Sequence, residues 1–430
     1  MNLTISGATK PLQGNPQLPG DKSISHRALL FASMAEGASR IRNFLHAGVT
    51  DVMINSLAAL GIEAEYLNEN DLLVLGRPWQ APRQTLDCGN SGTTMRFLLG
   101  ALASRPFQCT LDGTERLRQR PMARVVEPLI QMGARITSPS TTHLAPLTIQ
   151  GGHLHGIEYT LPVASAQVKT ALLLAAMAAE EPTTLQEPGP SRDHTERMLI
   201  SMGVSLQKQG NRILLEPEKN SLPALSTTIP GDFSAAAFLI TAALVVPGSN
   251  LHLEQVGVNP TRTGLLDVLK RMGARIQSGK SSLINGEPVS NLEIRSSGLK
   301  ATDISGDDVV CMIDEFPIFA VAATQAEGTT SIREAQELRV KESDRISALV
   351  RELRKMGAEI EEQPDGFDVS GPTRLKGTVV ESHKDHRLAM ALCVAGLIAE
   401  GETIIEGADS IEQSFPAFPI VLAEMGAEIR

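Results

Sequence analysis

A short phrase recurs six times along the chain and constrains its fold more than any other feature. Each copy is a large apolar residue, a glycine, and then Ala, Ile or Val. The glycines are separated by 72, 70, 70, 84 and 69 residues; they are Gly61, Gly133, Gly203, Gly273, Gly357 and Gly426. A nearly fixed period of this length indicates one supersecondary unit repeated along the chain.

The residues on either side of each glycine predict a helix followed by a strand. Residues 346–355 have the apolar spacing of an amphipathic helix before Gly357, and residues 358–360 alternate after it. Glycine readily ends a helix in the left-handed conformation. We therefore expect six α/β units of about 70 residues, which divide into two groups of three in a chain of 430 residues.

Composition narrows the class of protein. The hydrophobic fraction of 42% is sufficient for two cores, but no apolar run approaches the length of about 18 residues that a membrane helix needs. The start, Met1–Ser6, lacks the basic region and apolar core of an export signal. Four scattered cysteines show no metal-ligand spacing, and the net charge of -10 argues against nucleic acid. We expect a cytoplasmic protein without metal, cofactor, membrane or nucleic-acid binding.

Motifs rich in cations, hydroxyls and glycines lie between the repeats, where strands are expected to lead into helices. In the first, Ser23 and Arg27 are four residues apart on one side of a helix that Lys22 opens. In the second, a Gly-rich turn opens into a helix expected from Phe97; in the third, three arginines precede a helix-starting Pro121. The motifs are Pro19–Arg27, Asp87–Arg96, Asp112–Pro121, Ser165–Lys169, Ser191–Glu196, Asp314–Pro317, Arg339–Arg345 and Asp385–Arg387. Asn285 and Gly286, by contrast, are interpreted as turn residues only.

The sign of the charge at these helix starts indicates an anion site. A helix N-terminus is partially positive, so a Lys or Arg there is unfavourable by roughly 0.3–1 kcal/mol. Any one such run is usually a solvated first turn, but seven cations recur at these places: Lys22, Arg27, Arg120, Arg192, Lys341, Arg345 and Arg387. A bound polyanion reverses the effect, and Arg suits phosphate and carboxylate in particular.

Three of these motifs closely resemble the signatures of the 5-enolpyruvylshikimate-3-phosphate (EPSP) synthase family: Leu18–Arg27, Gly89–Arg96 and Arg339–Arg345. Matches continue in order to Pro416, so the resemblance covers essentially the whole chain. It implies an α/β fold of two similar domains, each of three βαβαββ repeats (an inverse α/β barrel), with the active site in the interdomain cleft. The domains would be residues 1–20 plus 231–430 and residues 21–230, with a hinge at the two crossings.

The resemblance also implies a reaction and its residues. Members transfer the enolpyruvyl group of phosphoenolpyruvate to shikimate 3-phosphate in the shikimate pathway, releasing phosphate through a tetrahedral intermediate. The implied catalytic residues are Asp314, which takes the proton of the attacking 5-hydroxyl, Glu342, which handles the proton at the methylene carbon, and Lys22. The implied shikimate 3-phosphate ligands are Lys22, Ser23, Arg27, Ser165, Ala166, Gln167, Arg192, Asp314 and Lys341. The implied phosphoenolpyruvate ligands are Lys22, Gly92, Arg120, Gln167, Arg345 and Arg387.

These residue types suit that chemistry. Two polyanions repel one another, so several cations are needed to bring them together in a poorly hydrated cleft. Proton transfer at the hydroxyl and at the carbon needs a base and an acid, which two carboxylates can supply. The sequence departs from the common family pattern at Ala166, where Ser is frequent, at Gln413, where many members have a Lys ligand, and at Glu337, where Asn is frequent. No ligand role is therefore expected for Gln413.

Two alternatives remain open from the sequence. The related transferase that acts on UDP-N-acetylglucosamine shares the expected fold, but it usually has a reactive Cys where this chain has Glu115 and an Asn where it has Ser23. A non-catalytic two-domain clamp for a phosphorylated metabolite could use the same cations without needing Asp314 or Glu342. The favoured expectation is the monomeric enzyme acting on small anionic substrates.

Overall fold

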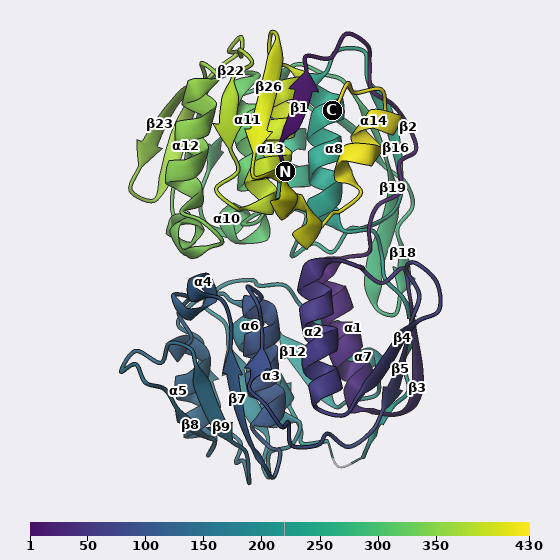
Figure 1. The fold of residues 1–430 in the computed structure, drawn as a ribbon, viewed down its shortest axis with the longest axis vertical. Helices are drawn as coiled ribbons and strands as arrows, with labels where there is room; N and C mark the ends of the chain where they lie inside the picture. The colour runs from purple at the N-terminus through teal and green to yellow at the C-terminus, as the bar shows by residue number, and fades with distance from the viewer. Residues whose placement is uncertain (219) are drawn as a thin grey trace. The chain divides into compact units, whose positions relative to one another are not determined.

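The computed structural model describes residues 1–218 and 220–430 and divides into two compact units. The first unit comprises Gly20–Ile229 and Ile284–Glu287, and the second comprises Met1–Pro19, Pro230–Leu283 and Pro288–Arg430. Within the described residues each unit contains three small sheets arranged around buried helices (Figure 1). The two units therefore share one architecture.

One repeat of the first unit shows the pattern on which all six are built. Its elements in chain order are β6 (Leu86–Asp87), α3 (Gly92–Leu102), β7 (Gln108–Asp112), α4 (Glu115–Arg118), α5 (Ala123–Gln131), β8 (Arg135–Thr137) and β9 (Leu147–Gln150). β6 and β7 are parallel and are joined through α3, whereas β9 is antiparallel to both β7 and β8. Apart from the single turn of α4, this order is βαβαββ.

The other two repeats of the first unit repeat this topology. One contains α1 (Lys22–Met34), β3 (Ala35–Arg42), α2 (Gly48–Ala59), β4 (Glu63–Tyr66), β5 (Leu72–Gly76), β14 (Leu222–Pro223) and β15 (Ser226–Thr228). The other contains β10 (Glu158–Thr160), α6 (Ala166–Ala176), β11 (Thr183–Gln186), α7 (His194–Ser201), β12 (Leu206–Gln209) and β13 (Arg212–Leu215).

The second unit is built from three sheets of the same kind. The first has β2 (Gln13–Gly14), α8 (Phe233–Val245), β16 (Asn250–Gly257), α9 (Gly264–Arg271), β17 (Arg275–Ser278), β18 (Ser282–Ile284) and β19 (Glu287–Arg295). The second has β20 (Leu299–Lys300), β21 (Asp303–Ile304), α10 (Asp307–Cys311), α11 (Phe316–Thr324), β22 (Ala326–Ile332), the 3₁₀ helix η1 (Gln336–Val340), α12 (Arg345–Lys355), β23 (Glu359–Gln363) and β24 (Gly366–Gly371). The third has β25 (Val379–Glu381), α13 (His386–Leu397), β26 (Glu402–Glu406), the 3₁₀ helix η2 (Ala408–Gln413), α14 (Phe418–Glu424) and β1 (Leu3–Ser6).

Two repeats take a strand from a distant part of the chain. β14 and β15 run parallel to β3, although about 180 residues separate them in sequence. β2 runs parallel to β16 in the same way. Each of these strands completes a sheet of its own unit. The chain passes from the second unit to the first at Gly20 and returns at Pro230.

The six repeat glycines all have the left-handed conformation that the sequence predicts. Their φ angles lie between 88° and 107°, a region that side chains with a Cβ rarely adopt. Each follows an outer helix (α2, α5, α7, α9, α12 or α14), and five precede a strand. After the sixth glycine, Gly426, the expected strand is reduced to one antiparallel bridge between Ile429 and Ile5.

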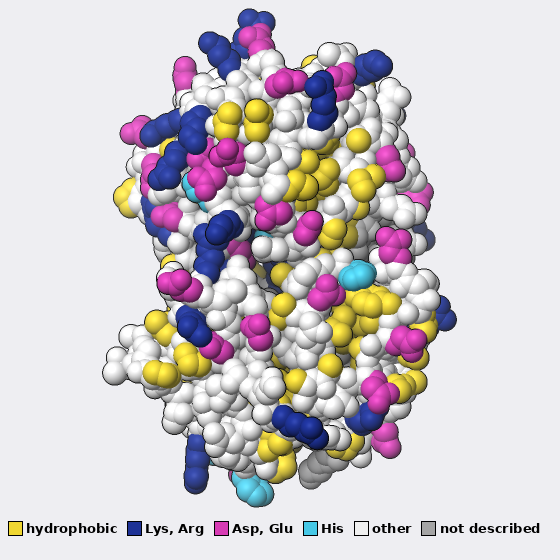
Figure 2. Space-filling model, in the orientation of Figure 1, with side chains coloured by type: hydrophobic (Ala, Val, Ile, Leu, Met, Phe, Trp, Pro, Cys, Tyr) yellow, Lys and Arg dark blue, Asp and Glu magenta, His cyan; other side chains and the backbone are white. Residues whose placement is uncertain are grey.

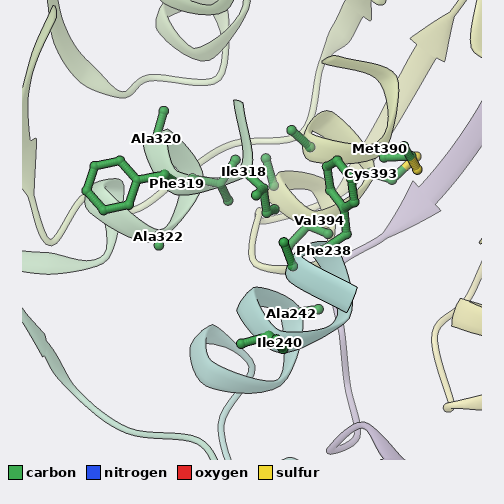
Figure 3. Packing of buried hydrophobic residues seen from close by; sticks show 14 of the residues in the cluster. Phe238, Ile240, Ala242, Ile318, Phe319, Ala320, Ala322, Met390, Cys393 and Val394 are labelled. Atoms are coloured by element: carbon green, nitrogen blue, oxygen red, sulfur yellow. The ribbon is translucent and has the colours of Figure 1, made fainter. Parts of the chain in front are cut away.

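The core of each unit lies among three inner helices, each of which is followed directly by a strand of its own repeat. They are α1, α3 and α6 in the first unit and α8, α11 and α13 in the second. In the second unit α8 and α13 are buried on nearly every side, which agrees with their apolar sequences. Phe238 of α8, Ile318 of α11 and Val394 of α13 pack together there (Figure 3). In the first unit α3 and α6 approach so closely that a Cβ on Gly100 would lie 2.2 Å from the carbonyl oxygen of Ala171. This close packing holds the inner helices of each unit in fixed positions relative to one another.

Local predictions differ from the structure at three places. The helix expected from Phe97 already begins at Gly92, because Ser91 caps it. The helix expected at Pro121 begins at Ala123. Asn285 is part of a turn, but the prediction that it is nothing more is wrong. Its amide nitrogen also donates to the hydroxyl of Thr227, and the turn belongs to the first unit.

Surface charge contributes less to the fold than these cores. Lys and Arg side chains are interspersed with Asp and Glu on the face drawn in Figure 2. Exposed pairs such as Arg374–Glu400, at 2.8 Å, are typically worth at most about 1 kcal/mol. The stability of each unit therefore depends mainly on its buried helices.

Candidate functional site

In the first unit, three motif residues cap the three inner helices. Asp21 Oδ1 accepts from the backbone N–H of Ile24 at the start of α1, and Ser91 Oγ accepts from Thr94 at the start of α3. Ser165 Oγ accepts from the N–H of Val168 at the start of α6. These caps leave other first-turn N–H groups, including that of Ala166, at helix ends that favour anions. Lys22 is the first residue of α1.

Three hydrogen bonds hold the guanidinium of Arg27 in place. Its guanidinium donates to the hydroxyls of Thr195 at 2.7 Å and Thr170 at 2.9 Å, and to the carbonyl of Ser23 at 2.9 Å. The side chain is 2% exposed. Burial lowers the pKa of Arg27 to about 10, against the opposing effect of the Glu196 charge. Arg27 thus has a fixed position beside Ser23.

Arg192 lies next to this group, because its Nη1 atom is 3.5 Å from the hydroxyl of Ser23. A charge on Arg192 also lowers the pKa of Arg27, although less than burial does. Ser23, Arg27 and Arg192 come from α1 and from the segment before α7, which are far apart in sequence. The fold therefore gathers three residues implied for shikimate 3-phosphate.

A second group forms around Gly92. Gln167 donates to the hydroxyl of Thr93 at 2.8 Å and accepts from Nη1 of Arg96. Arg96 also donates to the carbonyl of Pro121 at 3.0 Å. A Cβ built on Gly92 would lie 3.0 Å from Nη1 of Arg96 and 3.1 Å from Nη1 of Arg120. Gly92, Arg120 and Gln167 are therefore gathered around Arg96, a residue of the Gly-rich motif to which the sequence assigned no role.

In the second unit, carboxylates and guanidinium groups alternate at the starts of α11, α12 and α13. Asp314 lies between two arginines: its Oδ1 is 3.4 Å from Nη1 of Arg345, and its Oδ2 is 3.4 Å from Nη2 of Arg387. Arg345 also contacts Glu342 at 2.7 Å and Asp385 at 2.8 Å. The structure thus gathers both implied catalytic carboxylates and two implied phosphoenolpyruvate ligands.

The electrostatics of this cluster follow from burial and pairing. Burial, the largest single effect, would raise the pKa of Asp385, but the charge and hydrogen bond of Arg345 together with the charge of His386 lower it, so the pKa lies below its usual value. Burial would likewise lower the pKa of Arg345, but Asp385, Glu342 and Asp314 together raise it. Both groups therefore remain charged although neither is more than 1% exposed.

Lys341 lies between η1 and α12, and Arg339 fixes this segment. The Arg339 guanidinium donates to the carbonyls of Pro364 and Gln363 and to the carboxylates of Asp344 and Glu362, at 2.7–3.0 Å. The sequence motif alone assigns no role to Arg339, because three of these acceptors lie at the end of β23 and in the turn that follows it, about 25 residues away in the sequence. Glu337 and Gln413 lie in η1 and η2, respectively.

Among residues 1–218 and 220–430, no group of three or more His, Cys, Asp or Glu side chains could hold a metal ion. None of the helices in this part of the chain is long and apolar enough to cross a membrane. No disulfide bond joins the cysteines of the described residues, and burial raises the pKa of Cys109 and Cys393 to about 12.

Comparisons with known proteins show the family of this chain. The family model described as EPSP synthase (3-phosphoshikimate 1-carboxyvinyltransferase) matches residues 7–422. A 3-phosphoshikimate 1-carboxyvinyltransferase of Thermodesulfovibrio yellowstonii is 48% identical over 97% of this chain and 98% of its own length. One of Desulforamulus reducens is 47% identical over the full length of both chains.

Solved structures show the same likeness. An EPSP synthase of Acinetobacter baumannii is 37% identical with a TM-score of 0.89, covering 100% of this chain and 99% of that one. The enolpyruvyl transferase NikO of Streptomyces tendae, at 20% identity and a TM-score of 0.83 over 100% and 98% of the chains, shares the fold. The predicted two-domain α/β fold and the predicted transferase class are confirmed. The chain belongs to the EPSP synthase (3-phosphoshikimate 1-carboxyvinyltransferase) family.

Proposed function

We propose that this chain transfers the enolpyruvyl group of phosphoenolpyruvate to the 5-hydroxyl of shikimate 3-phosphate, and that the two clusters described above are the two halves of its active site. The family assignment supplies the reaction. The residues implied by the motifs fall into one cluster in each unit, which supports their proposed roles. The proposed site is completed when these two halves face a common cleft.

The first unit is suited to holding anions. Lys22, Arg27, Arg120 and Arg192 lie at or near starts of its helices, where the backbone N–H groups also favour negative charge. In the proposal, the Ser23–Arg27–Arg192 group holds shikimate 3-phosphate together with Ser165, Ala166 and Gln167 at the start of α6. The group around Gly92 holds phosphoenolpyruvate with Lys22.

The second unit is suited to proton transfer. Asp314 takes the proton of the 5-hydroxyl as its oxygen adds to C2 of phosphoenolpyruvate, and Glu342 delivers a proton to C3, which becomes a methyl group. In the tetrahedral intermediate, Glu342 then takes back a methyl proton as the C–O bond to phosphate breaks, and the proton held by Asp314 leaves with the phosphate. Arg345 and Arg387 stabilise the charge that develops, because fixed guanidinium groups need little reorganisation.

The observation that carries the proposal is the position of Asp314 between Arg345 and Arg387. In the free protein these guanidinium groups balance the carboxylate. When the carboxylate and phosphate of phosphoenolpyruvate bind the same two arginines, they take over that role and leave Asp314 oriented toward the acceptor hydroxyl. Lys341 completes the shikimate 3-phosphate site from this unit.

Phosphate release tests the proposal. The protein is incubated with phosphoenolpyruvate and either shikimate 3-phosphate or UDP-N-acetylglucosamine, with each substrate alone as a control. The proposal predicts release only with shikimate 3-phosphate. Release with the sugar nucleotide alone would identify a different acceptor, and tight binding of shikimate 3-phosphate without turnover would indicate a non-catalytic clamp.

The two units are proposed to act as two domains, with boundaries at residues 20/21 and 230/231, in a cytoplasmic monomer that binds small anions. The compact units described above divide at Pro19/Gly20 and Ile229/Pro230, which supports these boundaries, although Ile284–Glu287 also belongs to the first unit. Two such crossings are suited to a hinge, so substrates are expected to close the cleft. Small-angle scattering measures this: the radius of gyration falls on adding both ligands, and an unchanged value contradicts closure.

A further inference from the structure

Lys169 is a fully buried cation that none of the roles above uses. It lies on α6, two residues after Gln167, and its side chain is 0% exposed. Its Nζ atom is 3.0 Å from Glu187 Oε2 and 2.7 Å from Glu196 Oε1, and these two carboxylates are also buried. A buried charge cluster of this kind is costly to form, so a role beyond packing is worth testing.

Both carboxylates are connected to residues of the proposed shikimate 3-phosphate site. Glu187 accepts a hydrogen bond from the hydroxyl of Ser191, the residue before Arg192. Glu196 follows Thr195, whose hydroxyl accepts from Nε of Arg27 at 2.7 Å. Lys169 therefore joins the two ends of the segment 187–196 to α6.

The same cluster balances the charge of Arg27. Thr170, the residue after Lys169, also accepts from Arg27, so the guanidinium lies beside the cluster. Lys169 is the buried cation that contacts both Glu187 and Glu196. Without Lys169, less positive charge would offset these two carboxylates behind Arg27 and Arg192, and a bound phosphate would be disfavoured.

We propose that Lys169 is a positioning residue for shikimate 3-phosphate: with Glu187 and Glu196 it holds the Arg192 segment against α6, and it offsets the negative charge of these two carboxylates behind Arg27 and Arg192. The inference rests on the proposed function for the identity of the ligand. Lys169 does not touch the reacting atoms, so its effect is expected in the binding of one substrate and not in the chemical step.

The test compares Lys169→Met with Lys208→Met. Lys208 approaches the same Glu196 oxygen at 3.7 Å but is 30% exposed, so it is a matched control. Lys169→Met is expected to raise the KM for shikimate 3-phosphate about tenfold or more, with kcat and the KM for phosphoenolpyruvate within about threefold. Lys208→Met is expected to change none of these by more than about threefold. Calorimetry with shikimate 3-phosphate alone checks the binding step.

A second variant separates charge from packing. Lys169→Met with Glu187→Gln removes one charge of each sign and keeps an acceptor for Ser191, so it should restore the KM for shikimate 3-phosphate to within about threefold of wild type. A folded Lys169→Met with a normal KM overturns the inference, as does a double variant that recovers nothing. If the single variant does not fold, the double variant decides alone. Failure of the wild type to turn over refutes the proposed function instead, and binding of shikimate 3-phosphate then still tests Lys169.

Discussion

The Nε atom of Arg345 donates to Oδ2 of Asp385 at 2.8 Å, and neither side chain is more than 1% exposed. Oδ1 of the same carboxylate accepts from the backbone N–H of Arg387, where it caps α13. One buried carboxylate thus fixes the side chain of one implied phosphoenolpyruvate ligand and the helix start that carries the other. The Arg345–Asp385 pair is therefore expected to affect both the free energy of unfolding and the positions of Arg345 and Arg387.

Asp385→Asn is therefore expected to lower the free energy of unfolding by about 3 kcal/mol, because it leaves a buried guanidinium partly uncompensated. Urea denaturation at pH 7 measures this. Glu400→Gln, in the exposed pair with Arg374, serves as the control and should change it by less than about 1 kcal/mol. Equal effects of the two variants would contradict the conclusion that the buried Asp385–Arg345 pair contributes more to stability than the exposed pair.

The same variant has a pH signature. The folded pKa of Asp385 is below its usual range, so below about pH 4 the unfolded state binds more protons and the contribution of this carboxylate to stability is lost as pH falls. The difference in unfolding free energy between wild type and Asp385→Asn should therefore be constant above about pH 5 and shrink below about pH 4. If this difference grew on acidification, the folded-state pKa of Asp385 would be raised and not lowered.

His26 gives a separate pH dependence in the first unit. It donates from Nδ1 to the carbonyl of Lys22, and burial lowers its pKa from 6.5 to about 4. Because the unfolded chain takes up a proton near pH 6.5 and the folded chain does not, wild type should lose about 2 kcal/mol between pH 8 and pH 5 relative to His26→Gln. The variant His153→Gln, at a side chain 98% exposed, should show the wild-type slope.

Asp314→Asn and Glu342→Gln test the proposed proton transfers. Each should lower kcat by about 10²–10⁴-fold, the usual effect of removing a general acid or base. Binding of shikimate 3-phosphate, measured by calorimetry, should change far less. Asp308→Asn, in an exposed pair with Arg271, is the control carboxylate in the same unit. Turnover near the wild-type rate in either variant would remove that residue from the mechanism.

Gly92→Ala tests the crowding around the phosphoenolpyruvate group. Its Cβ would lie 3.0–3.1 Å from the guanidinium atoms of Arg96 and Arg120, which must shift. The KM for phosphoenolpyruvate should rise about tenfold or more, with the affinity for shikimate 3-phosphate nearly unchanged. Gly48→Ala, where a Cβ meets no atom within 4 Å, should leave both constants unchanged.

Local sequence determined the parts of this protein that depend on local geometry. The six left-handed glycines, their preceding helices and the cations at the helix starts follow from residue type and period, because backbone conformation and amphipathic spacing are properties of neighbouring residues. The motif resemblance added the family, which the comparisons confirm. α3 begins five residues before the expected Phe97, because Ser91 caps the helix and lets the glycine and threonines of the motif form its first turn.

Tertiary structure alone decided which distant residues meet. β14 and β15 pair with β3, Asp385 pairs with Arg345, and Lys169 lies between Glu187 and Glu196. No local pattern specifies such partners, since strand pairing and buried ion pairs depend on how helices from different repeats pack. The sequence therefore determined the units and the chemistry they carry, whereas packing decided which side chains hold that chemistry in place.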